Sequence, residues 1–313
     1  MGVRALDLPE VRAELIDHYN NPLVIDWWAK RPTPPTMILQ NPNGEELVVK
    51  PSGNDRRLKE ITRLHKAELF FVTSRMTDLA LAAAQSLPSF DLARHDLPSP
   101  TGFIIFEKPI ATDRNDYGGH GEEVFIAGAS WDLQSTRQFG DVLWFSFYID
   151  AYLTFDGQVA SGDLSEEEAE RQKHLQPRYS YTMDAGHVLG MPMNDDSVLN
   201  SWGATILASW LLMRQPLADV TEVDPDRAAR KRLARSGHEP RKVRLIELRR
   251  PKGSSESGEG ARDYQHQWIV RGHWRQQWYP SLQVHRPVWI APHVKGPDGA
   301  PLIGGEKVNV LKR

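Results

Sequence analysis

Three neighbouring runs set the class of the fold: GFIIFEKP at 102–109, EVFIAGASW at 123–131 and GDVLWFSFYI at 140–149. All three are rich in β-branched and aromatic residues, and Gly- and Asp-rich turns separate them, which is typical of strands that pair with their neighbours. The runs therefore predict a mainly antiparallel sheet.

Toward the N-terminus the pattern favours helices and one hairpin. Asp7 can cap a helix that has Pro9 in its first turn. The run MILQNPNGEELVVK (37–50) has apolar residues on both sides of Asn43-Gly44, a strong hairpin signal because both residues tolerate positive φ. Apolar residues recur every third position from Asn54, so residues 54–88, which include ELFFV, predict one long or two consecutive helices.

Helix signals continue in the second half of the chain. Ser165 with Glu168 predicts a capping box, and the apolar run 201–217 predicts a helix with one buried face. The run DPDRAARKRLARSG (224–237) predicts a helix capped by Asp224 and ended by Gly237, with an exposed basic face. The predicted fold class is α+β, with mixed helices, antiparallel sheets and a basic, β-rich C-terminal module.

Charge is distributed unevenly along the chain. The net charge is −3, from 38 Lys and Arg against 41 Asp and Glu. Residues 227–313 hold 19 Lys and Arg against 7 Asp and Glu, a net of +12, so the first 226 residues carry −15. Such a cationic segment favours polyanion binding, because cations of the protein release counterions from nucleic acid. The alternative is that the two parts neutralise each other within one globule.

The length of 313 residues is enough for two domains. We predict an acidic α+β body at 1–200. We predict a helix and a basic, β-rich module that binds nucleic acid or a ribonucleoprotein at 201–313.

The run YQHQWIVRGHWRQQW (264–278) alternates, and a period of two puts Trp268 and Trp274 on a buried face, opposite a polar, basic row. Aromatic rings interleaved with cations are how single-stranded nucleic acid is commonly held. Trp278, Tyr279 and Trp289 are therefore candidate stacking residues, with core packing as the alternative. The candidate nucleic-acid-binding residues are Arg227, Arg230, Lys231, Arg235, Arg271, His273, Arg275, Gln277, Tyr279, Arg286, Trp289, His293 and Lys295.

Several functional classes lack their signatures. The chain contains no Cys, which excludes disulfides, thiolate metal sites and Cys nucleophiles and favours a reducing, cytoplasmic location. Phosphate-loop, dinucleotide, HExxH and GxSxG motifs are absent, so neither a cofactor nor a metal is predicted. No long apolar stretch or signal peptide is present, and no membrane partner is expected.

His273 is the candidate catalytic residue. Flanked by Arg271 and Arg275, its imidazole could act as a general acid or base in metal-independent RNA cleavage. The favoured alternative is that His273 and His293 only hydrogen-bond phosphate or backbone, because no second acid or base can be identified.

A family resemblance rests on WIVRGHWRQQWYPS (268–281), HRPVWIAPHVKGP (285–297) and the preceding DRAARKRLARSG (226–237). Together, residues 201–313 resemble a C-terminal module of proteins from actinobacterial phages and plasmids. They also resemble the C-terminal part of a type V anti-CRISPR family that lowers production of its target nuclease through its translation and messenger RNA. The resemblance implies a basic module that faces RNA or the ribosome, and recognition of a nascent peptide by the remainder. The first 200 residues show no such resemblance, so the peptide target does not carry over.

The sequence thus predicts an accessory protein of a phage or mobile element. It would bind RNA or ribosomes through its C-terminal module, recognise a nascent or host protein, and reduce expression of a target mRNA. Two alternatives stay open. One is a metal-independent endoribonuclease or toxin-like enzyme, and the other is a phage structural or protein-sequestering factor.

Overall fold

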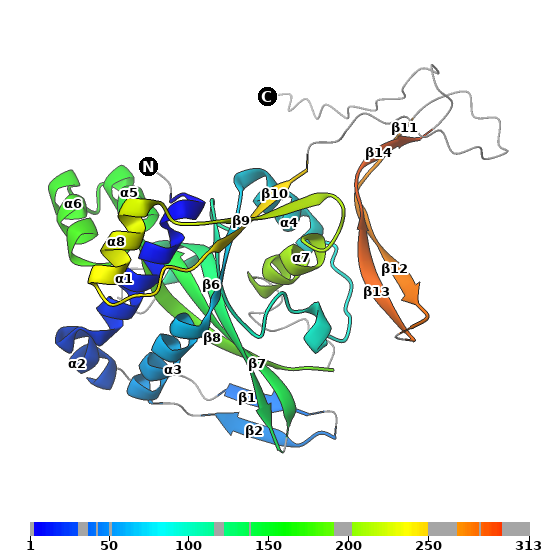
Figure 1. Cartoon of the computed structure of the whole chain (residues 1–313), viewed down its shortest axis with the longest axis horizontal. Coiled ribbons are helices and arrows are strands. Elements are labelled where there is room, and N and C mark those ends of the chain that lie inside the picture. The colour runs from blue at the N-terminus through cyan, green and yellow to red at the C-terminus, as the bar shows by residue number, and fades with distance from the viewer. Residues whose placement is uncertain are drawn as a thin grey trace, which may run out of the picture.

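A mixed sheet of eight strands forms the centre of the molecule (Figure 1). The computed structural model describes residues 3–30, 37–41, 43–49, 52–115, 122–137, 139–190, 202–249, 268–281 and 283–295. The helices are η1 Ala5–Asp7, α1 Leu8–Asn20, α2 Pro22–Lys30, α3 Gly53–Lys66, α4 Ser74–Ala84, η2 Arg94–Asp96, α5 Ala151–Ser161, α6 Glu166–Leu175, α7 Ala204–Leu212 and α8 Arg227–Arg235. The strands are β1 Met37–Gln40, β2 Glu46–Val49, β3 Glu68–Val72, β4 Thr101–Phe106, β5 Ala111–Asn115, β6 Glu122–Thr136, β7 Gly140–Asp150, β8 Tyr179–Val188, β9 Ala218–Val223, β10 Val243–Leu248, β11 Trp268–Val270, β12 His273–Tyr279, β13 Val284–Ile290 and β14 His293–Lys295.

The strand order confirms the α+β class and corrects one predicted element. The order is β8-β7-β6-β4-β3-β10-β9, with β5 paired to β6. β3 pairs in parallel with β4 and with β10, whereas the other pairings of this sheet are antiparallel. Of the two alternatives for residues 54–88, the two helices are found as α3 and α4, but the run ELFFV between them, which interrupts the helical period, is the strand β3. The strand was missed because a central strand covered on both faces is a continuous apolar run, which periodicity does not distinguish from a buried helix.

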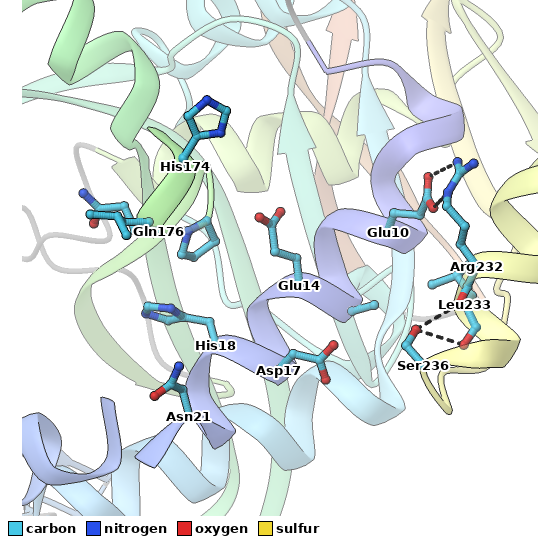
Figure 2. Close-up of a pocket in the computed structure, with 13 residues that line it drawn as sticks. Glu10, Glu14, Asp17, His18, Asn21, His174, Gln176, Arg232, Leu233 and Ser236 are labelled. Carbon is cyan, nitrogen blue, oxygen red and sulfur yellow. Dashed lines mark hydrogen bonds and ion pairs between the residues drawn. The ribbon is translucent and has the colours of Figure 1, made fainter. Parts of the chain in front are cut away.

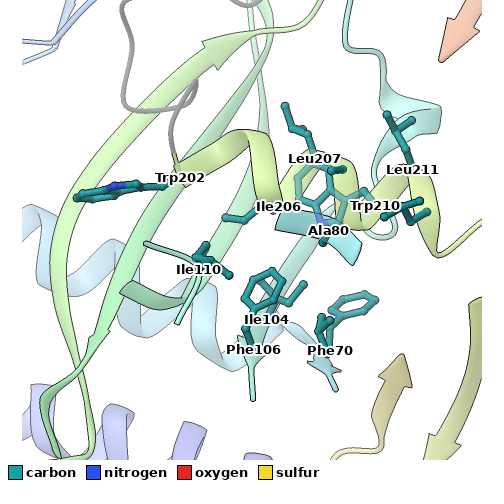
Figure 3. Packing of buried hydrophobic residues seen from close by; sticks show 14 of the residues in the cluster. Phe70, Ala80, Ile104, Phe106, Ile110, Trp202, Ile206, Leu207, Trp210 and Leu211 are labelled. Carbon is teal, nitrogen blue, oxygen red and sulfur yellow. The ribbon is translucent and has the colours of Figure 1, made fainter. Parts of the chain in front are cut away.

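Alternating side chains of the sheet serve two cores. Phe70 and Ile104 point to the face covered by α4 and α7, where they pack with Trp210 (Figure 3). Trp131 belongs to the same cluster. Their neighbours, including Phe71, point to the opposite face, which α1 and α3 cover. Every residue of α7 is buried, so the predicted single buried face was too narrow. The described helices include none that is both long and apolar enough to cross a membrane.

Local punctuation signals hold with two exceptions. Asp7 lies at the N-cap of α1, but its carboxylate accepts hydrogen bonds from Arg4 and does not cap the helix. The capping box of Ser165 and Glu168 is present at the start of α6, and β1 pairs with β2 around Gly44, whose φ is 79°. Gly237, with φ 78°, follows α8 as predicted. The N-cap of α8 is Asp226 rather than Asp224, because the Asp226 carboxylate accepts a hydrogen bond of 2.7 Å from the Ala229 amide.

The sheet does not break at residue 200. α7, β9 and β10 all follow that position, yet α7 lies in the core beneath the sheet and β10 pairs with β3. The basic segment itself is divided in space. α8 packs on α1 at one side of the molecule, while the β12–β13 hairpin lies at the other side (Figure 1).

Candidate nucleic-acid interface

The β12–β13 hairpin has an inner and an outer row. Trp274 lies opposite Trp289 and Trp278 opposite His285, so these residues share one face. The other face of β12 carries His273, Arg275, Gln277 and Tyr279, which follow one another at every second position.

Two tryptophans fasten the hairpin to the body. The Trp274 indole packs against the core beside α4 and donates a hydrogen bond of 2.8 Å to the Ala83 carbonyl. Trp289 is only 6 % exposed and meets Trp274 edge to face, with ring centroids 5.3 Å apart. A Cβ on Gly272 would stand 2.4 Å from the Trp289 ring, so glycine is needed for this close approach. Trp274 therefore faces the body, as the alternation predicted. The stacking role predicted for Trp289 was wrong, because its ring is buried.

The outer row is accessible to a ligand. His273 and Arg275 are exposed, Gln277 is half-buried and Tyr279 is 39 % exposed. The Arg275 guanidinium donates to the Gln277 amide oxygen at 2.8 Å, which aligns the two side chains along the strand. This row is the polar face that the alternation predicted.

An exposed ring pair lies at the turn end of the hairpin. Trp278 is 44 % exposed, and its ring lies 4.9 Å from that of His285. His285 was missed by the sequence reasoning, because only the cross-strand register brings it opposite Trp278. The two ring planes are tilted by 52°, so each exposed ring offers its own face, and bases stack on such faces.

Arg286 has a structural role instead of the predicted binding role. Its guanidinium donates to the buried Asp96 carboxylate at 2.6 Å and to the Asp91 carbonyl at 3.0 Å. A buried ion pair of this kind holds β13 to the segment before β4, and it removes Arg286 from the set of free cations.

The remaining candidates of this region are exposed. Arg271 lies between β11 and β12, whereas His293 and Lys295 belong to β14, which pairs with β11. The ring Nδ1 of His273 lies 3.1 Å from the Arg271 carbonyl oxygen, and that of His293 lies 3.1 Å from the Ala291 carbonyl oxygen. Both imidazoles thus contact local backbone. The Trp268 side chain lies outside what the structure describes.

The second basic group lies on α8. Arg227, Arg230, Lys231 and Arg235 are exposed, as the helical spacing predicted. Between them Arg232 pairs with Glu10 of α1, at 2.6 and 2.8 Å.

A pocket of about 440 Å³ lies beside the contact of α8 with α1, near the end of α6, and acidic side chains of α1 line it (Figure 2). Burial raises the pKa of Glu14 and lowers the pKa of His18 in this pocket. The inner side of α8 therefore faces negative charge, as internal neutralisation requires. No group of three or more His, Asp or Glu suited to a metal ion occurs among the described residues.

Comparisons with known proteins give little further guidance. No protein-family model matches the chain, and no curated protein matches it. Among solved structures it is similar to one titled "Crystal structure of AcrVA2", with 13 % identity over 92 % of this chain and 93 % of that chain, at a TM-score of 0.38. Identity and TM-score are both low, so the function proposed below rests on the residues of this chain.

Proposed function

We propose that the protein binds single-stranded RNA, free or within the ribosome, along the outer row of the β12–β13 hairpin. The observation that carries the proposal is the row of His273, Arg275, Gln277 and Tyr279 on one face of β12. The exposed Trp278–His285 pair lies on the opposite face, at the turn end of the same hairpin. From His273 to Tyr279 the strand extends about 20 Å at 3.4 Å per residue.

The chemistry of the row suits a flexible, negatively charged strand. Arg275 offers a planar guanidinium to phosphate oxygens, Gln277 offers amide donors and acceptors, and Tyr279 offers a ring face that accepts any base. Trp278, on the opposite face, offers a second ring to a strand that passes around the turn end of the hairpin. Arg271 and Lys295 add exposed charge at the other end. Because the hairpin is held by two tryptophans, its outer row is ordered before a ligand arrives, which lowers the entropic cost of binding.

The cellular role follows from the resemblance of residues 201–313 to the type V anti-CRISPR family. It favours RNA at the ribosome over other polyanions, and it suggests that binding reduces expression of a target mRNA of phage–host conflict. In this scheme the acidic body recognises a nascent or host protein. The exposed α8 cations lie at the other side of the molecule, so only a long RNA or a ribosomal surface can reach both groups.

Fluorescence anisotropy with a short labelled single-stranded RNA tests the proposal. Three exposed cations, Arg271, Arg275 and Lys295, predict a slope of about −2 for log affinity against log salt, at about −0.7 per phosphate. R271Q/R275Q is expected to weaken binding at least about tenfold, since each charge-assisted hydrogen bond contributes about 1.5–3 kcal/mol. The charge-matched control is K231Q/R235Q on α8, which should bind the short RNA like the wild type.

Equal losses in both double variants, or binding that does not respond to salt, would contradict the proposal. The same samples, run on a denaturing gel, report on the alternative role of His273. We expect intact RNA, whereas cleavage that H273A abolishes would show the endoribonuclease.

A further inference from the structure

A groove of about 570 Å³ lies between α3, the end of β2 and the end of β6. These elements lie away from the β12–β13 hairpin and from α8 (Figure 1). A narrow space next to it, lined by Ser146 of β7 and Asp184 of β8, lies between α3 and the sheet. Arg63, Lys59, Val49 and Gln134 line both spaces, so the narrow space opens into the groove.

Three cations of α3 line the groove at helical spacing. Lys59, Arg63 and Lys66 are four and three residues apart, which places them on one side of the helix. Lys59 and Lys66 are exposed, and their ammonium groups make no hydrogen bond or ion pair with any residue in the described ranges. These charges are therefore available to a ligand.

The carboxylates of the groove are already engaged. Asp55 accepts from the Ser52 hydroxyl at 2.6 Å as part of the cap of α3. Asp132 accepts from the Thr101 hydroxyl at 2.7 Å and from the Gln134 amide at 2.9 Å. Their donors are neutral, so both carboxylates keep their negative charge, and Asp55 interacts electrostatically with Lys59. Neither accepts a hydrogen bond from Lys59 or Lys66 among the described residues, so the ammonium groups keep their donors for a ligand.

The same holds for the carboxylates beneath the groove. Glu60 accepts from Arg63 at 2.8 Å, from the Ser130 hydroxyl at 2.7 Å and from the Tyr148 hydroxyl. Asp184 accepts from the Ser146 hydroxyl at 2.7 Å.

Arg63 forms the floor of the groove and is only partly satisfied. The residue is 7 % exposed, and its Nη1 donates to Glu60, Ser130 and Ser146. Its Nε is buried and has no hydrogen-bond partner among the described residues. An unpaired buried donor of a charged group is costly, about 1–3 kcal/mol or more. An anionic oxygen would satisfy it if the Arg63 side chain turned Nε toward the groove.

We propose that this groove binds a small phosphorylated ligand, with its phosphate held by Lys59, Arg63 and Lys66. Val48 and Leu58, which are 52 % and 47 % exposed at the rim, would cover an apolar or planar body next to the phosphate. The groove volume lies within the range of 300–1,000 Å³ usual for small-molecule sites. A nucleoside monophosphate combines the required charge and flat body, and the site is independent of the RNA-binding hairpin.

Isothermal titration calorimetry with AMP, inorganic phosphate and adenosine tests the site. We expect AMP to bind more tightly than phosphate, because the rim contacts the base, and adenosine not to bind. K59Q/K66Q should weaken AMP at least about tenfold, equivalent to 1.4 kcal/mol. K231Q/R235Q removes the same charge from α8 and should leave the affinity unchanged. Both double variants change exposed side chains, so folding is retained.

Three results would overturn the proposal. They are no binding heat with millimolar AMP, equal weakening of AMP binding by K59Q/K66Q and K231Q/R235Q, and equal binding of adenosine and AMP. Loss of AMP binding in R271Q/R275Q but not in K59Q/K66Q would assign the nucleotide to the hairpin instead. R63K adds a second measure, since it keeps the charge and removes Nε. It should lower AMP affinity while its far-ultraviolet circular dichroism matches the wild type.

Discussion

Replacing Trp289 and Trp278 one at a time distinguishes the residue that anchors the β12–β13 hairpin to the body from the residue proposed to contact RNA. The two rings lie on the same face of one hairpin, but Trp289 is 6 % exposed and Trp278 is 44 % exposed. Trp289→Ala deletes a buried indole from the core cluster and removes its edge-to-face partner contact with Trp274. Large aromatic truncations of this kind cost about 3–5 kcal/mol.

No hydrogen bond is lost with Trp289, because its indole Nε1 is buried without a partner. The expected cost is therefore pure packing, and Trp289→Phe, which also removes the unpaired N–H, should cost less than Trp289→Ala. Trp278→Ala changes a ring near the surface and should leave stability within about 1 kcal/mol. It should instead weaken RNA by about 1–3 kcal/mol, which is the contribution of one stacked base.

Urea unfolding, followed by circular dichroism at 222 nm, and anisotropy with short RNA measure the two quantities on the same samples. RNA affinity of Trp289→Ala is measured below its unfolding transition. If Trp289→Ala unfolds at the wild-type urea concentration and loses RNA binding, Trp289 is a stacking residue after all. In that case the assignment of the inner face is refuted.

Three other changes test separate parts of the structure. Changing Arg227, Arg230, Lys231 and Arg235 to Gln should leave the melting temperature unchanged, since their side chains are exposed, but should weaken cosedimentation with ribosomes; a large fall in melting temperature would show that they join α8 to the body. Glu60→Gln should destabilise the protein by about 3–5 kcal/mol in urea, because it leaves the buried Arg63 guanidinium without its carboxylate. Burial lowers the pKa of His18 below 6.5, so the unfolded chain binds the proton first as the pH falls. The free energy of unfolding should therefore decrease as the pH drops through 6.5. His18→Gln should make this decrease shallower, and an unchanged slope would contradict the assignment to His18.

Signals that reside within a few residues were readable from the sequence. The capping box of Ser165 and Glu168, the turn at Asn43-Gly44 and the end of α8 at Gly237 each depend on local backbone chemistry. The outer row of β12 was also readable, because side chains of a strand alternate whatever the strand packs against.

Features that depend on distant partners were not readable. The run ELFFV became a strand because β4 and β10, far away in sequence, pair with it on both sides. Trp289 is buried because α4 and α7 lie beneath the hairpin, a contact that no spacing within 285–297 reveals. The α3 groove was missed for the same reason, since Lys59, Arg63 and Lys66 resemble any solvated helix face until β2 and β6 enclose them.

The charge of the basic segment illustrates how these two kinds of information combine. Part of its positive charge is neutralised within the chain, because Arg232, Arg244 and Arg286 pair with Glu10, Glu68 and Asp96 of the acidic part. Internal neutralisation therefore applies to these three residues, whereas the polyanion binding proposed above concerns others of the same segment. Among the described residues, Arg275 of β12 and the exposed cations Arg227, Arg230, Lys231 and Arg235 of α8 form no ion pair. Net charge along a chain thus overstates the field that a polyanion meets, and the free cations of each surface determine the affinity.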